Sequence, residues 1–120
     1  MNMALVDPSQ HNTVQRKFDD VYQRVRRAFT WQVRDADVSD STKVELMALM
    51  SLVDRCELAT HHIVSSRRVA RCHEGDAYCH AHYGESTEAA ATWALNTAIL
   101  FDAFADVFEP YARRTTPNVA

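Results

Sequence analysis

The sequence predicts an all-α protein: a small bundle of three to four amphipathic helices with a long central helix. The chain of 120 residues has only two glycines and three prolines, and it has neither between residues 9 and 74 nor between residues 85 and 109. Strand-rich folds need frequent turn residues, so the scarcity of glycine and proline favours long helices. Apolar residues also recur at spacings of three and four, which is the repeat of one helix face.

The composition indicates one globular domain. Hydrophobic residues make up 47% of the chain and charged residues 24%, which is an ordinary balance for a soluble protein. We expect a single helical domain over residues 1–120, with an ordered core over about residues 8–112 and flexible termini.

Charge and cysteine content restrict the class of function. The net charge of −3 disfavours nucleic acid as the main partner. No apolar run approaches the ~20 residues that span a bilayer, and the N-terminus does not have the pattern of a secretory signal. Three cysteines, an odd count, therefore indicate reduced thiols, and we expect a cytoplasmic protein.

The first helix is predicted from Pro8 or Thr13 to Arg34. The Asp–Pro pair at residues 7–8 has the form of an N-cap followed by a first helical position. One apolar face follows the helical repeat: Val14, Phe18, Val21, Tyr22, Val25, Ala28, Phe29 and Val33. Trp31 lies off this face, where it either contacts a partner or packs against a neighbouring helix.

A turn is predicted after the first helix, from Asp35 onward. Thr42 and Glu45 have the spacing of a capping box for the next helix. The alternating oxygens resemble a calcium loop, but Asp40 and Leu46 stand where such a loop needs Gly and Glu. Capping is therefore the expected role of this stretch.

The second helix is predicted from Lys43 to about Cys72, with a bend or break at Ser65–Ser66. One apolar stripe comprises Leu46, Leu49, Val53, Cys56, Ile63 and Val64, and a second comprises Val44, Met47, Leu58 and Val69. The two stripes point in nearly opposite directions on one helical wheel. Such a helix is either central in its domain or shared with another chain, so we expect self-association or a protein partner. The alternative is a four-helix fold in which this segment is broken.

The third helix is predicted from Ser86 or Thr87 to Pro110, which should end or kink it. A dense aromatic stripe is expected to lie in the core: Trp93, Thr97, Leu100, Phe101, Phe104, Val107, Phe108 and Tyr111. Leu95 and Ile99 lie on the other side of this helix and are candidates for an exposed contact.

The stretch CHEGDAYCHAHYG, residues 72–84, combines zinc-compatible side chains with both glycines. Cys72, Cys79, His80 and His82 are the candidate ligands, and the two thiols could also form a redox pair. Structural zinc sites usually pair cysteines two to four residues apart, whereas six residues separate these two. The favoured interpretation is a polar loop between two helices, with no cofactor.

The sequence contains no G-x-S-x-G, P-loop, Rossmann or H-E-x-x-H pattern, so we do not expect an enzyme. Most of its basic residues are arginines. Asp19, Asp20, Asp35 and Asp37 are interspersed among those of the first segment, which indicates a mixed solvated face and not a nucleic-acid-binding stripe.

Three stretches together resemble the QslA family of small helical antiactivators, which act on LuxR-type quorum-sensing regulators in pseudomonads: HNTVQRKFDDVYQRVRRAFTWQV, KVELMALMSLVDRCELATHHIV and AILFDAFADVFEPYARR. The resemblance covers nearly the whole chain and includes no catalytic or binding motif. It implies an α-helical homodimer that binds the ligand-binding domain of such a regulator. It further implies that the protein covers the surface through which the regulator dimerises and so prevents DNA binding.

We therefore expect a non-enzymatic regulatory protein that binds a LuxR-type transcription regulator. The resemblance transfers no contact residues, so the candidates come from the helix faces. Val44, Met47, Leu58 and Val69 are the first candidates for dimer or partner contact, and Trp31, Leu95 and Ile99 are secondary. The alternative function is a small zinc-binding or redox-responsive helical protein that uses the Cys/His stretch.

Overall fold

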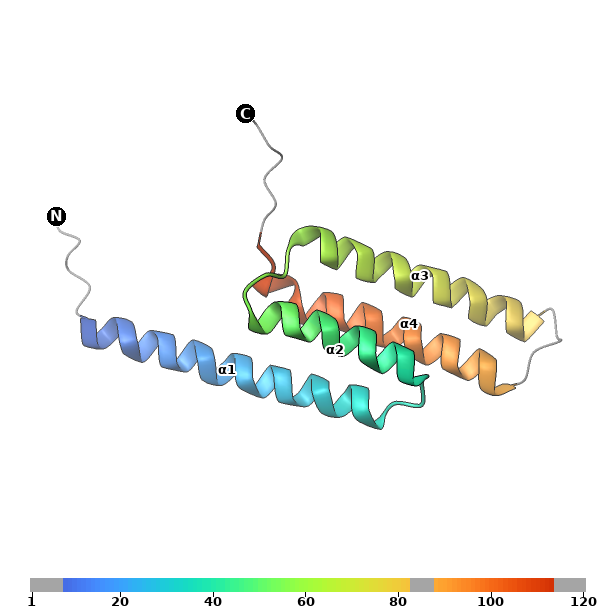
Figure 1. Ribbon diagram of the computed structural model, residues 1–120, viewed down its shortest axis with the longest axis horizontal. Coiled ribbons are helices and arrows are strands. Elements are labelled where there is room, and N and C mark those ends of the chain that lie inside the picture. The colour runs from blue at the N-terminus through green and yellow to red at the C-terminus, as the bar shows by residue number, and fades with distance from the viewer. Residues whose placement is uncertain (1–7, 83–87, 114–120) are drawn as a thin grey trace, which may run out of the picture.

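The computed structural model describes residues 8–82 and 88–113, and for residues 8–19 and 88 the backbone only. The elements are α1 (Pro8–Asp35), α2 (Asp40–Asp54), α3 (Thr60–His82), α4 (Glu88–Phe108) and the short 3-10 helix η2 (Glu109–Tyr111) (Figure 1). The predicted all-α bundle is confirmed, and it has four main helices. Among the described residues, no helix is long and apolar enough to cross a membrane.

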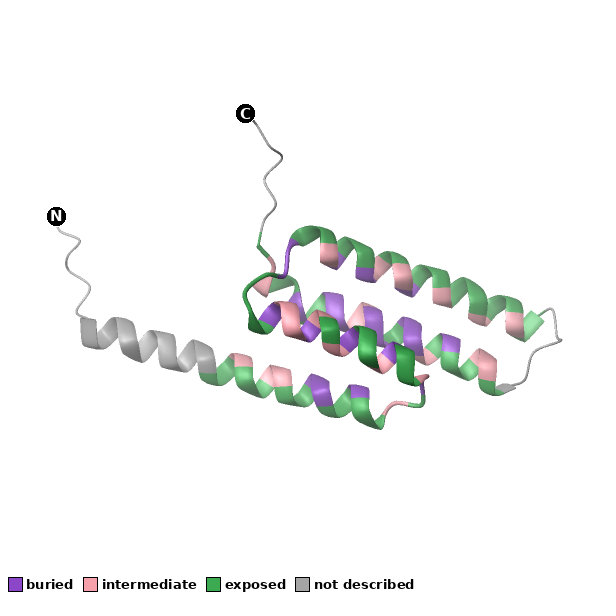
Figure 2. Cartoon of the chain, viewed as in Figure 1, coloured by how far each residue is buried: buried purple, intermediate pink, exposed green. Residues whose placement is uncertain are grey.

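The bundle is organised around α4. Figure 1 shows α4 with α3 along one side, α1 along the other and α2 in front of it. The largest helix–helix interface is the one between α3 and α4, while α1 and α2 each contact α4 and one another. Buried residues accordingly concentrate on α4 and on the sides of the other helices that face it (Figure 2). Within the described part of the chain, this arrangement leaves the side of α4 opposite α2 without a covering helix.

The core is built from the aromatic stripe of α4 and the apolar sides of its neighbours. Phe29 of α1 makes edge-to-face contacts with Phe104 and Phe108, at ring-centroid distances of 5.8 and 5.4 Å. The predicted stripe is confirmed for Phe101, Phe104 and Phe108, which are buried. Trp93 and Val107 are exposed instead, and alanines occupy part of the buried side of α4.

The predicted second helix is broken into α2 and α3. The chain leaves α2 after Asp54 and passes through Cys56, which adopts a left-handed conformation with φ of 58°. The amide of Glu57 donates to the carbonyl of Leu52 (2.8 Å), which closes the end of the helix. The break occurs here and not at Ser65–Ser66, so the predicted bend is wrong.

Two packing contacts explain the position of the break. The turn carries Leu58 into the core, where it is fully buried, and a continuous helix could not place it there. Ser66 lies inside α3 and is buried, and its hydroxyl donates to the carbonyl of Phe101 (2.8 Å). The prediction that Leu58 contacts a partner is therefore wrong, because this side chain belongs to the protein's own core.

The start of α2 also differs from the prediction. Ser39 is the N-cap, and its hydroxyl accepts a hydrogen bond from the amide of Thr42 (3.3 Å). Thr42 itself is buried, with its hydroxyl 3.4 Å from that of Thr97 on α4. The predicted capping box of Thr42 and Glu45 is wrong because the helix begins at Asp40, three residues before the predicted start at Lys43. The predicted Asp7 cap and the start at Ser86 or Thr87 lie outside the described residues, as do most of the termini expected to be flexible.

The stretch from Cys72 to His82 is helical, so the predicted loop is wrong at these residues. A single glycine costs a helix only ~1 kcal/mol relative to alanine. Two contacts with α4 stabilise this part of α3: Arg71 forms an ion pair with Asp102 (2.8 Å), and the ring of His73 stacks on Phe101 at 6.4 Å. Tertiary packing therefore overrides the glycine.

A partly exposed ion pair between Arg26 and Asp54 holds α1 against α2. Arg26 donates from Nε and Nη2 to the two carboxylate oxygens of Asp54, both at 2.8 Å, and the hydroxyl of Tyr22 donates to the same carboxylate (2.5 Å). The Arg26 guanidinium lowers the pKa of Asp54, whereas burial and the Asp54 carboxylate raise the pKa of Tyr22. One carboxylate thus accepts three hydrogen bonds across the α1–α2 interface.

The C-terminal segment closes one end of the bundle. The amide of Arg113 donates to the carbonyl of Leu58 (2.8 Å), and its carbonyl accepts from the amide and the hydroxyl of Thr60, both at 3.0 Å. Ala59, which follows Leu58 in the sequence, donates its amide to Nδ1 of His62 (2.9 Å). The first turn of α3 is therefore capped by the C-terminal segment and by its own histidine.

We predict that Asp54→Asn lowers the free energy of unfolding by about 1 kcal/mol, because it removes the charge from a bidentate pair that is only about one-third exposed. Urea unfolding at neutral pH measures this change. Glu57→Gln is the matched control, because its pair with Arg55 is more exposed and its loss should change stability by less than about 0.5 kcal/mol. Equal losses of stability in the two variants would contradict the stabilising role given to the ion pair of Arg26 with Asp54.

Burial and the neighbouring His61 lower the pKa of His62 below its ordinary value of 6.5. The unfolded chain then binds a proton more readily than the folded chain, so stability should fall as the pH drops below about 6.5. His62→Gln keeps an acceptor for the Ala59 amide but cannot titrate. We predict that wild type loses more stability than His62→Gln between about pH 7.5 and about pH 5.5 in urea unfolding. A substitution of the exposed His82 should leave this loss unchanged.

Candidate partner-binding face

The structure separates the sequence-predicted contact residues into three groups. Trp31, Leu95 and Ile99 are exposed on one side of the molecule. Val44 is exposed on α2, away from that side, while Met47 and Val69 are half-buried against the core. Since Leu58 is buried, the second stripe predicted for one long helix does not exist as a continuous surface.

Trp31, Leu95 and Ile99 form what we call the α4 face. They are 67%, 49% and 52% exposed, respectively. Leu95 and Ile99 are one turn apart on α4, on the side that no helix covers, and Trp31 projects from the neighbouring α1. Three large apolar side chains therefore lie in water around the most apolar helix of the bundle.

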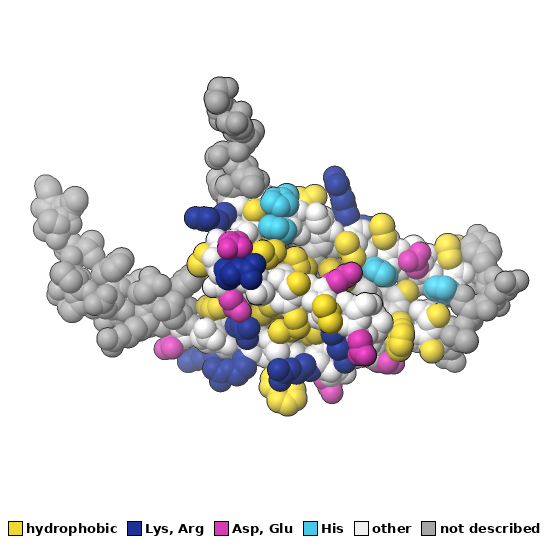
Figure 3. Space-filling view, in the orientation of Figure 1, with side chains coloured by type: hydrophobic (Ala, Val, Ile, Leu, Met, Phe, Trp, Pro, Cys, Tyr) yellow, Lys and Arg dark blue, Asp and Glu magenta, His cyan; other side chains and the backbone are white. Residues whose placement is uncertain are grey.

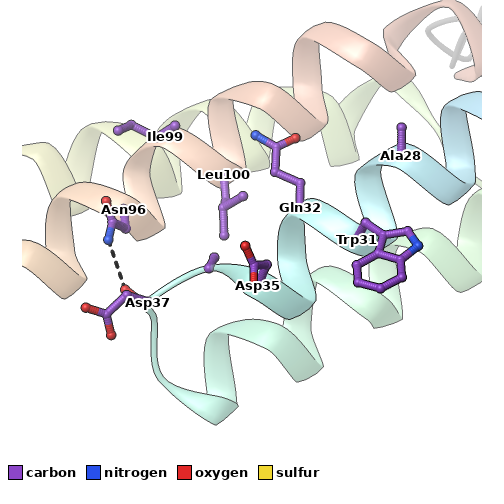
Figure 4. A pocket seen from close by; sticks show the side chains of 9 residues that line it. Ala28, Trp31, Gln32, Asp35, Asp37, Asn96, Ile99 and Leu100 are labelled. Atoms are coloured by element: carbon purple, nitrogen blue, oxygen red, sulfur yellow. Dashed lines mark hydrogen bonds between the residues drawn. The ribbon is translucent and has the colours of Figure 1, made fainter.

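The α4 face borders a groove of about 500 Å³ between α1, the α1–α2 connection and α4. Figure 4 shows Trp31 and Gln32 on α1, with Asn96, Ile99 and Leu100 on α4 across from them. The complete lining is Ala28, Trp31, Gln32, Asp35, Ala36, Asp37, Asn96, Ile99 and Leu100.

Hydrogen bonds fix one end of this groove. Nε1 of Trp93 donates to the carboxylate of Asp37 (2.8 Å), and the side-chain amide of Asn96 donates to the Asp37 carbonyl (3.0 Å), which Figure 4 shows as a dashed line. Both bonds tie the α1–α2 connection to α4. The groove therefore has a preformed wall at this end.

Three arginines share the side of α1 that carries Trp31. Arg24, Arg27, Trp31 and Arg34 follow one another at spacings of three and four, so they lie along one helix side. All three guanidinium groups are exposed, and none forms an ion pair with a described residue. In contrast, Arg26, Arg67 and Arg71 are each bound to a carboxylate. These three arginines thus place positive charge beside Trp31, and the nearest carboxylates are those of Asp20 on α1 and of Asp35 and Asp37 at the groove.

The Cys/His candidates do not converge. Cys72 and Cys79 are exposed and free, and they lie two turns apart on one side of α3. Seven residues of helix separate their Cα atoms by about 10 Å, beyond the ~7 Å that a disulfide spans. The helical conformation of this stretch therefore cannot hold a disulfide between them.

His80 and His82 lie on the last turn of α3. Nδ1 of His82 is 2.9 Å from the carbonyl of Tyr78, and the two rings stack at 3.9 Å. Among the described residues, no group of three or more His, Cys, Asp or Glu side chains could hold a metal ion. The zinc alternative therefore has no assembled ligand set in this part of the chain.

Comparison with known protein families, with curated proteins and with solved structures finds no match to this chain. The functional argument consequently depends on the surfaces of the molecule.

Sequence reasoning found the three apolar residues of the α4 face but not the groove or the arginine row. The groove depends on how the α1–α2 connection is tied to α4, which no local pattern encodes. Arg24, Arg27 and Arg34, the arginine row, recur at the helical spacing in the sequence. Their importance depends on which other arginines form ion pairs with carboxylates in the folded chain.

Proposed function

We propose that this chain is a non-enzymatic regulatory protein that binds another protein through the α4 face. The observation that carries the proposal is the exposure of Trp31, Leu95 and Ile99 around a preformed groove. Tryptophan and arginine are enriched among the residues that dominate binding energy at protein interfaces, and here they lie side by side.

The composition of the surface supports a protein partner with a defined chemistry. An apolar side chain or helix edge of the partner fills the groove beside Trp31, and carboxylates of the partner face Arg24, Arg27 and Arg34. Burying the three apolar side chains supplies affinity, while the unpaired arginines accelerate association and select acidic partners.

The resemblance of the sequence to the QslA family suggests the class of partner. We propose that the partner is the ligand-binding domain of a LuxR-type transcription regulator and that the α4 face covers the surface through which the regulator dimerises. Such a mechanism requires a matching apolar surface and no catalytic group, which agrees with the side chains available on the α4 face. The expected outcome is loss of DNA binding by the regulator.

The homodimer expected from the sequence is part of this proposal. With the α4 face assigned to the partner, Val44 and Met47 on α2 are the remaining candidates for self-association. Val44 is 68% exposed, and Met47 is half-buried next to it.

We predict that Ile99→Asp weakens binding of the regulator by at least about thirtyfold, because a carboxylate cannot be buried in an apolar contact at the centre of an interface. Binding is measured by calorimetry with the purified ligand-binding domain, and folding by circular dichroism. Val44→Asp is the matched control, with the same charge change on another surface. It should leave regulator binding intact and weaken self-association in sedimentation experiments.

If Val44→Asp removes regulator binding and Ile99→Asp does not, the partner binds α2 and the α4 face is wrongly assigned. If wild type binds no LuxR-type ligand-binding domain, the proposed class of partner is wrong.

We predict that the double substitution Arg27→Glu with Arg34→Glu slows association with the partner by about tenfold and removes much of its salt dependence. The reason is that both arginines are exposed and neither forms an ion pair with a described residue, so they attract carboxylates over a distance. Stopped-flow measurements at low and high salt test this. Arg55→Glu, on another surface, should leave the association rate unchanged.

A further inference from the structure

A second groove lies between α2 and α3, on the other side of α4 from the partner-binding face. Its volume is about 450 Å³, within the range of small-molecule sites. Its lining comprises Glu45, Ala48, Leu49, Leu52, Arg55, His62, Ser65, Ser66, Val69 and Phe101. Figure 3 shows hydrophobic side chains gathered in the middle of this side of the molecule.

The groove exists because α2 and α3 both pack on α4 and scarcely on each other. Leu49 and Leu52 of α2 form one wall, Val69 of α3 forms the other, and Phe101 of α4 forms the floor. The three wall residues are half-buried, so each presents part of its apolar surface to the groove. Ser66 adds no free polar group to the floor, because its hydroxyl already donates to the Phe101 carbonyl.

Polar donors gather at the end of the groove where α2 turns into α3. The Arg55 guanidinium donates to Glu57 through Nε (3.2 Å) and to Ser51 through Nη1 (3.1 Å), which leaves Nη2 without a partner among the described residues. Ser65 also lines this part of the groove. The opposite end carries the carboxylate of Glu45, whereas this end carries the ion pair of Arg55 with Glu57.

His62 adds a donor of known orientation to the same end. Its Nδ1 accepts the Ala59 amide, so the neutral ring carries its proton on Nε2. Burial, and secondarily the neighbouring His61, lowers the pKa of His62, which favours the neutral ring. Arg55 and His62 therefore offer two N–H donors beside an apolar channel.

We propose that the groove between α2 and α3 binds a small amphiphile: an unbranched acyl chain with a carboxylate head group. The chain lies along Leu49, Leu52, Val69 and Phe101. The carboxylate accepts hydrogen bonds from Arg55 and from Nε2 of His62, and Glu45 disfavours the reverse orientation.

The volume of the groove argues against a helix as its occupant. A helix about 10 Å wide needs roughly 1,200 Å³ for a 15 Å length, the length of α2 that lines the groove. The total free space in the groove, with its open mouth included, is about 850 Å³ and is still smaller than that volume. A single extended chain fits inside it, whereas a helix could rest only on its rim.

The test uses the full chain and three probes with the same ten-carbon tail: decanoate, decanol and decyltrimethylammonium. Amide chemical shifts in NMR titrations give both the site and the affinity. Decanoate should shift the amides of α2 and α3 around the groove. It should bind about tenfold more tightly than decanol, which is the factor expected for one charge-assisted hydrogen bond, and the cation should bind more weakly still.

Two substitutions separate the head-group contact from the tail contact. Arg55→Gln should lower decanoate affinity about tenfold and leave decanol affinity unchanged, because the apolar walls remain. Leu52→Gln should weaken both probes. Arg68→Gln is the control, since Arg68 is exposed on α3 and does not line the groove.

The proposal is overturned if decanoate shifts no amide around the groove, if the shifts map to the α4 face, or if all three probes bind equally well. It does not depend on the proposed partner. Ile99→Asp should therefore bind decanoate like wild type, even where it no longer binds the regulator.

Discussion

The fold depends on the contact between α1 and α4 that Phe29 makes with Phe104 and Phe108. These three rings lie within 5.0–5.8 Å of one another and are almost completely buried. Edge-to-face aromatic contacts of this kind add to the stabilisation from burial, and they fix the rotation of both helices. Once α4 turns this side inward, its opposite side faces solvent, because the other three main helices of the described chain pack elsewhere on it.

Both grooves follow from that constraint. On one side, Leu95 and Ile99 stay exposed, and Trp31 extends over the edge of the same surface. On the other side, α2 and α3 each cover part of α4 and leave a channel between them, with Phe101 at its base. The two surfaces have different chemistry: a wide apolar face beside free arginines, and a narrow channel with donors at one end. We propose a protein for the first and a small amphiphile for the second.

Much of the fold could be predicted from the sequence, because helix periodicity is a local property. The apolar spacing placed α1 and α4 within a few residues of their ends, and it identified Phe101, Phe104 and Phe108 as core. The break after Asp54 could not be predicted, since a cysteine in a left-handed conformation gives no signal like that of glycine. At Gly75 the sequence predicted a loop where the chain is helical, because contacts with α4 stabilise the helix around this glycine.

The candidate site was only partly predictable for the same reason. Trp31, Leu95 and Ile99 were visible as residues off the core-facing stripes, because this depends on spacing alone. Leu58 was assigned to the surface, because the assignment assumed a continuous helix. The groove and the free arginines depend on tertiary contacts, namely the bonds of Asp37 with Trp93 and Asn96 and the carboxylates that occupy the other arginines.

The bonds between Arg113 and the start of α3 have a consequence for the order in which the chain folds during synthesis. Thr60 donates both its amide and its hydroxyl to the Arg113 carbonyl, so the cap of α3 comes from a residue 53 positions later in the chain. A nascent chain can form α1, α2 and their ion pair while this cap is still missing. The first turn of α3 gains these hydrogen bonds only after α4 and Arg113 have been synthesised, so the start of α3 reaches its final form later than the ion pair between α1 and α2.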